Sequence, residues 1–153
     1  MEVRDVDPEE ANHVKVNSAS IYAYTLIYLG HHKKAKQVIH DALENIGDSD
    51  HASIAVMLNS LGLAEEGPNG SEIDALKWYS RSLSRRRQMS VIKPENLVIP
   101  LCHIADLASK KPQKYELAMK YLNEARDIMK KKCWIHIHSA TIQYTFGVVK
   151  LRM

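Results

Sequence analysis

Three residues near the C-terminal end carry side chains that commonly bind zinc. Cys133, His136 and His138 are close together in the sequence. A structural zinc site needs four ligands, and the spacing here is not one of the usual zinc-binding frameworks. The pattern is more typical of a helix start whose polar residues face outward. We therefore expect no bound metal and no cofactor.

Cys102 and His103 would supply a nucleophile and a base if their side chains faced each other. Neighbouring residues on a helix point about 100° apart, so these two cannot face each other. Cys102 is more typical of a small apolar filler or of a groove residue. The His31-His32 pair is typical of a solvated loop. Phosphate-binding loops, hydrolase elbows and metalloprotease motifs are also missing from the sequence, so we expect a protein that is not an enzyme.

Clusters of basic residues are a further candidate for chemistry. Cations at helix C-termini complement the helix dipole and keep the surface soluble. Two of the clusters are triplets, and each lies at the end of the second helix of a helical hairpin that the sequence predicts (described below). If these hairpins stack, the two triplets would lie on the same edge of the stack, where they could bind an acidic tail, an anionic lipid or RNA. The triplets have no interleaved aromatic residues and the net charge is only +3, so nucleic acid is not favoured. The clusters are Lys33-Lys34, Arg85-Arg86-Arg87, Lys110-Lys111 and Lys130-Lys131-Lys132.

Length and composition indicate an ordinary globular chain. The 153 residues suffice for one domain, and a hydrophobic share of 45% with 25% charged residues is typical of soluble proteins. No apolar run approaches the ~20 residues of a membrane span, and the polar N-terminus is unlike a signal peptide. Two cysteines fit a reducing compartment. We expect a cytoplasmic protein, with the nucleus as the alternative, built from a lead-in (1–12) and a helical domain (13–153).

The stretch from Ile54 to Leu83 predicts two helices that fold back on each other. Its first half has apolar residues at helical spacing, and a similar pattern follows the break at Gly67-Pro68-Asn69-Gly70. A loop this short requires an antiparallel hairpin. Gly62 and Ala75 are small enough to let the two backbones approach closely.

The same hairpin pattern returns along the chain. Self-similarity at a period of about 40 residues is typical of a solenoid of stacked hairpins. In the first helix of each predicted hairpin a small residue recurs, at Ala23, Gly62, Ala105 and Gly147, which are 39, 43 and 42 residues apart. In the second helix of each hairpin a small residue recurs at Ala35, Ala75 and Ala118, which are 40 and 43 residues apart.

Prolines and polar residues predict where the helices begin. Pro8 starts a first helix of about Glu9 to Leu29, and Pro100 either kinks the fifth helix or marks its true start. The last helix, from about Ile135 to Leu151, has no partner after it. It either caps the array or precedes further repeats of a longer protein, and its open face would allow self-association.

These repeats resemble the tetratricopeptide repeat from about Asn17 to Val149. Their long period and the Met57–Leu61 phrase look most like the kinesin light chain type. The pattern departs from the family at Tyr22, where an aliphatic residue is usual, and at Pro100. The family's large–small pairs appear as Leu61-Gly62, Ile104-Ala105 and Phe146-Gly147 in first helices, and as Ile39/Ala42, Tyr79/Ser82 and Leu122/Ala125 in second helices.

The resemblance implies an all-α, right-handed superhelix of about seven helices, arranged as three antiparallel hairpins plus one helix. The first helices would line a concave groove that binds a peptide or a partner protein. Asn59 lies where kinesin light chain-like repeats use an asparagine to bond a peptide backbone. The implied groove residues are Ser20, Tyr24, Tyr28, Asn59, Leu63, Cys102, Asp106 and Tyr144.

A protein–protein interaction scaffold is therefore the function that we expect. The clamp that some tetratricopeptide proteins use for chaperone tails needs basic and amide residues where this chain has Ser20, Tyr24 and Asp106, so we do not expect that ligand. Two alternatives stay open. One is a structural module that self-assembles through its last helix, and the other is a basic edge that binds nucleic acid or anionic lipid.

Overall fold

The computed structural model describes residues 8–46, 51–91, 93–131 and 137–153. Within them it has seven α-helices, two short 3-10 helices and no strand, which confirms the predicted all-α class. Residues 1–7 of the predicted lead-in lie outside this part. None of the described helices is both long and apolar enough to cross a membrane. The elements are α1 (Pro8–Tyr28), α2 (His32–Glu44), α3 (His51–Glu65), α4 (Glu72–Arg87), η1 (Pro94–Leu97), α5 (Val98–Ser109), η2 (Pro112–Lys114), α6 (Tyr115–Lys131) and α7 (Ile137–Arg152).

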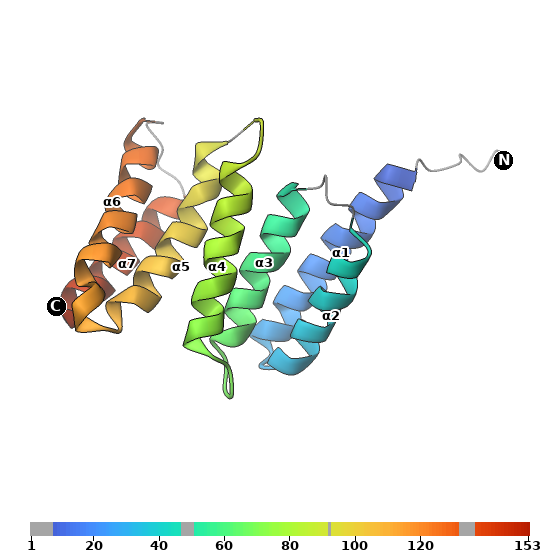
Figure 1. Cartoon of the computed structure of the whole chain (residues 1–153), viewed down its shortest axis with the longest axis horizontal. Coiled ribbons are helices and arrows are strands. Elements are labelled where there is room, and N and C mark those ends of the chain that lie inside the picture. The colour runs from blue at the N-terminus through green and yellow to red at the C-terminus, as the bar shows by residue number, and fades with distance from the viewer. Residues whose placement is uncertain (1–7, 47–50, 92, 132–136) are drawn as a thin grey trace.

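The helices lie side by side in an array that follows the chain order from α1 to α6, and α7 lies against α5 and α6 rather than beyond α6 (Figure 1). Each α-helix contacts the next one, and α1 also contacts α3 while α5 also contacts α7. The first helices of the chain and the last ones therefore occupy opposite ends of the array (Figure 1).

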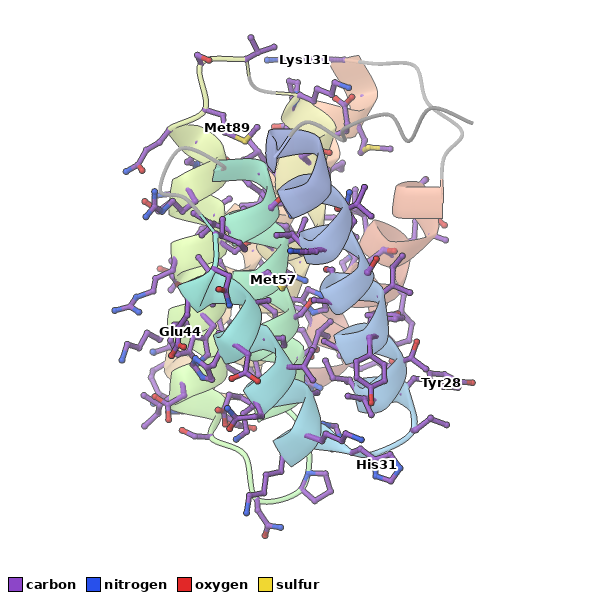
Figure 2. The ribbon with its side chains drawn as sticks, turned by 90° about the vertical axis from the view of Figure 1, so that its right-hand side faces the viewer. Tyr28, His31, Glu44, Met57, Met89 and Lys131 are labelled. Carbon is purple, nitrogen blue, oxygen red and sulfur yellow. The ribbon has the colours of Figure 1, made fainter. Side chains whose placement is uncertain are left out.

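Two hydrophobic cores hold the array together. The first lies among α1, α2 and α3, where Ile39 and Met57 are fully buried. The second joins α4, α5, α6 and α7 around Leu101 and Leu122. Figure 2 shows Met57 between α1 and α2, whereas Tyr28 points outward at the end of α1. Burial of an apolar stripe from each helix is thus what fixes neighbouring helices to one another.

A glycine ends α1 in the way that its sequence position predicts. Gly30 has a φ of +82°, its N–H donates to the carbonyl of Ile27, and the N–H of His31 donates to that of Leu26. These two bonds form a Schellman motif, which satisfies carbonyls that the helix end would leave unpaired. The chain can therefore turn into α2 within a few residues.

The turn between α3 and α4 follows the Gly67–Gly70 break that the sequence predicts. Asn69 has a φ of +63°, and Ser71 caps α4 by accepting a bond of 3.2 Å from the N–H of Asp74. Beyond the turn the two helices approach closely. A Cβ on Gly62 would lie 2.4 Å from the ring of Tyr79, so only glycine fits against this buried ring.

Pro100 does not kink α5. The helix begins at Val98, so Pro100 lies in its first turn. Backbone N–H groups in a first turn have no partner within the helix, so a proline there removes no helical hydrogen bond. Of the two alternatives that the sequence left open, the helix start is the one that holds. The predicted start of the last helix at Ile135 lies outside the described residues.

Candidate functional site

A groove of about 580 Å³ crosses α1, α3, α5 and α7. It is lined mainly by apolar and small polar side chains, together with one arginine that reaches it from α4. Four of the residues that the sequence predicted for a groove line it, namely Ser20, Tyr24, Asn59 and Leu63. The other lining residues are Ile21, Thr25, Val56, Ser60, Arg86, Ile99, His103 and Thr141.

Helical spacing explains why the lining residues of α1 and α3 lie on the same side of the groove. Ser20 and Tyr24 are four residues apart on α1, and Val56, Asn59 and Leu63 follow at spacings of three and four on α3. Residues at these spacings lie on one face of a helix. Contact between α1 and α3 then brings the two faces together.

Asn59 has an unsatisfied polar atom at this side of the groove. Its side-chain Oδ1 is buried and has no hydrogen-bond partner among the described residues. Most buried polar atoms in folded proteins have a partner, because an unpaired one loses its hydration without compensation. The amide is therefore ready to accept a hydrogen bond from a molecule in the groove.

Arg86 reaches the groove from the core-facing side of α4. It continues the line of buried residues formed by Ala75, Tyr79 and Ser82, at helical spacings of four, three and four. Its Nε is buried without a hydrogen-bond partner, and burial lowers the pKa of its guanidinium. No ion pair of Arg86 occurs with any side chain that the structure describes.

The structure places the members of the Arg85–Arg87 triplet in different surroundings. Arg87 pairs with Glu124 of α6 at 2.6 Å, whereas Arg86 faces the groove. In the second triplet, Lys130 and Lys131 are exposed, and Lys132 lies outside the described residues. The arginine triplet therefore does not present three free cations on one edge.

One lining residue of the groove, His103, belongs to a cluster of stacked and hydrogen-bonded side chains. The ring of His103 stacks on Tyr79 with 4.6 Å between centroids, and the Tyr79 hydroxyl donates to Oε1 of Glu66. Burial lowers the pKa of His103 to about 4, which the carboxylate of Asp106 offsets in part. Burial also raises the pKa of Glu66 and that of Tyr79. At neutral pH, His103 therefore presents an uncharged ring to the groove.

The other predicted residues lie away from this groove. Tyr28 and Tyr144 are 86% and 74% exposed and do not line it. Cys102 is buried in the second core, and burial raises the pKa of its thiol to about 11. Asp106 forms an ion pair with Arg152 at 2.9 Å. The structure thus brings four of the eight predicted side chains together and leaves the other four apart.

Among the lining residues that sequence reasoning missed, Arg86 and His103 are the two with a basic side chain. Arg86 extends a line of buried positions on α4, so its spacing of four residues from Ser82 could have revealed it. His103 is next to Cys102, and the rotation of about 100° per residue decides which of the two faces the groove.

The candidate zinc ligands Cys133 and His136 lie outside the described residues, and the side chain of His138 is not described either. Among the side chains that are described, no three histidine, cysteine or acidic residues come together as a metal site would require.

A larger hollow of about 700 Å³ lies between α1 and α2. Its lining includes Val16, Tyr22 and Val38, together with Lys15 and Asp41. None of the buried unpartnered polar atoms of the described residues belongs to its lining. Size alone favours this hollow, but two buried polar atoms without a partner, Asn59 Oδ1 and Arg86 Nε, belong to residues that line the groove.

No protein-family model, curated protein or solved structure matches the chain.

Proposed function

We propose that this protein is a non-catalytic scaffold whose groove binds an extended segment of another protein. The observation that carries the proposal is the buried, unpaired Oδ1 of Asn59 in a groove that residues of five helices line. An amide accepts one hydrogen bond and donates others, so it can pair with a peptide backbone whatever the sequence of the peptide. Tyr24 and Leu63 beside it add apolar area for side chains of the ligand.

The architecture in this proposal is a right-handed solenoid of antiparallel hairpins of the tetratricopeptide type. Contacts between α3 and α4 support the antiparallel pairing. Ser82 donates a bond of 2.6 Å to the carbonyl of Ala55, while Tyr79 contacts Gly62 and Glu66. Positions later in α4 thus contact positions earlier in α3. The groove of such a stack is formed before the ligand arrives, so binding costs little ordering entropy.

Selection from a library of random twelve-residue peptides displayed on phage tests the proposal. Selected peptides are synthesised, and their Kd values for the full chain are measured by isothermal titration calorimetry. Tyr24→Ala and Asn59→Ala should each weaken binding about tenfold, since one lost buried contact or hydrogen bond contributes roughly 1–2 kcal/mol.

Tyr28→Ala is the matched control, because it removes the same side chain one turn along α1, where Tyr28 is 86% exposed and outside the groove. It should leave the Kd unchanged. The proposal fails if no peptide is selected. It also fails if the selected peptides bind the Tyr24 and Asn59 variants as tightly as they bind the unaltered chain.

A further inference from the structure

Arg86 is the one charged side chain among the described residues that line the groove. Asp and Glu are missing from that lining, and burial keeps His103 neutral near pH 7. The groove therefore carries a single positive charge that no lining residue balances. A cation that is partly removed from water and lacks a counter-ion is costly to keep in a folded protein.

The neighbouring residue, Arg87, shows how a carboxylate commonly offsets the desolvation of an arginine. Arg87 is 46% exposed in its side chain, and it has Glu124 at 2.6 Å. Arg86 is more buried than Arg87, and burial is the cause that lowers the pKa of its guanidinium. Among the described side chains, the more buried of these two adjacent arginines is the one without a carboxylate partner.

We propose that the ligand of the groove supplies this missing carboxylate, which is seated against the guanidinium of Arg86. The inference rests on the proposed function and names its ligand class, an extended peptide with one acidic residue among apolar ones. A guanidinium matches a carboxylate because its N–H groups can form two parallel hydrogen bonds. Ile21, Val56 and Ile99 line the same groove and suit apolar ligand side chains on either side of the acid.

The position of Arg86 gives the site its selectivity. The guanidinium lies on the core-facing stripe of α4, so packing restricts its movement more than that of an arginine on a solvated face. Because Arg86 and Asn59 line the same groove, one ligand could offer a carboxylate to the first and its backbone to the second. Neutral Gln or Asn in place of the acid would leave Arg86 unpaired, so the groove should discriminate against them.

Positional-scanning libraries of decapeptides, incubated with the immobilised full chain and read by mass spectrometry, test this inference. One library has blocked termini and a second has a free C-terminal carboxyl group, so the two distinguish an acidic side chain from a chain end. With blocked peptides, Asp and Glu should be enriched at one position about tenfold over Asn and Gln. Enrichment in the free-carboxyl library alone would assign the carboxylate to the chain end.

Arg86→Gln should remove the acidic preference while the protein still retains peptides through the rest of the groove. Arg86→Lys keeps the charge but loses the paired N–H groups, and should keep only part of the preference. Arg87→Gln is the matched control, since it removes the same charge from the next residue, and it should keep the full preference. Circular dichroism of each variant verifies that the helices are intact.

The outcomes separate this inference from the proposed function. Peptides retained without acidic enrichment, or with an enrichment that Arg86→Gln leaves unchanged, would overturn the carboxylate site and leave the groove function standing. Retention of no peptide by the unaltered chain would overturn both. A phosphoserine position enriched above Asp and Glu would assign the site to phosphate and overturn the carboxylate.

Discussion

Gly62 and Gly147 occupy the same position of the repeat that the sequence predicts, yet the structure predicts opposite effects when each is changed to alanine. A Cβ on Gly62 would lie 2.4 Å from Cε1 and 2.7 Å from Cδ1 of Tyr79. A Cβ on Gly147 would have nothing within 4 Å. Because both residues lie inside helices, the gain in helix propensity is the same for both, about 1 kcal/mol.

The ring of Tyr79 cannot easily move away from a new Cβ. It is fully buried, it stacks on His103, and its hydroxyl donates to Glu66. Overpacking of this kind costs about 3 kcal/mol at the upper end of its usual range. We therefore expect Gly62→Ala to lower the free energy of unfolding by about 2 kcal/mol. Gly147→Ala should raise it by about 1 kcal/mol.

Urea denaturation followed by circular dichroism at 222 nm measures both effects. In thermal melts the difference between the variants should reach roughly 9 °C, at about 3 °C per kcal/mol for a chain of this size. A double-mutant cycle with Tyr79→Leu provides the control, because a smaller, more flexible side chain should accommodate the new methyl group. Equal stabilisation by the two alanine substitutions would refute the close contact between Gly62 and Tyr79.

Three further predictions concern the charged and polar groups near the groove. Tyr79→Phe removes the hydroxyl that donates to Glu66, and should lower the free energy of unfolding by about 1.5 kcal/mol in urea titrations. Burial lowers the pKa of His103 from 6.5 to about 4, so the folded state binds fewer protons than the unfolded state between these values. Stability should fall as the pH drops through that window, and His103→Gln should lessen the fall in urea midpoints. The raised pKa of Glu66 changes stability with pH in the opposite direction. If the slope of stability against pH is the same in the His103 variant as in the unaltered chain, the assignment to His103 is contradicted. Arg86→Met removes a cation with an unpaired buried Nε and should stabilise the protein by roughly 1 kcal/mol, whereas Arg87→Met, which breaks an ion pair, should not.

Much of the fold was predictable because its signals are local. The helix end at Gly30 depends on a backbone conformation that glycine adopts easily. The break at Gly67–Gly70 depends on a proline that cannot continue a helix, and the positive φ there belongs to Asn69. The helices themselves follow from apolar residues at helical spacing, which neighbouring segments do not alter. For Pro100 the sequence left two alternatives, because the exact start of a helix depends on packing as well as on propensity.

The groove residues were predictable only in part. Tyr24 and Asn59, which the sequence reasoning chose by their spacing from Ala23 and Gly62, both line the groove, since helical register decides which side chains share a face. Tyr28 lies on the same face of α1 as Tyr24, but it is the last residue of the helix and is 86% exposed. Asp106 was expected in the groove, but Arg152 binds it from a helix 46 residues further along the chain.

The sequence by itself determined where the helices form, where they break and that the pattern repeats. These features depend on backbone preferences and on periodicity within about twenty residues. Only the tertiary structure decided which polar groups find partners. Arg87 meets Glu124, 37 residues away, while Arg86 and Asn59 meet no partner among the described residues. Pairing across such separations depends on how the helices pack, and that packing is what leaves an unpaired cation and an unpaired amide oxygen in the same groove.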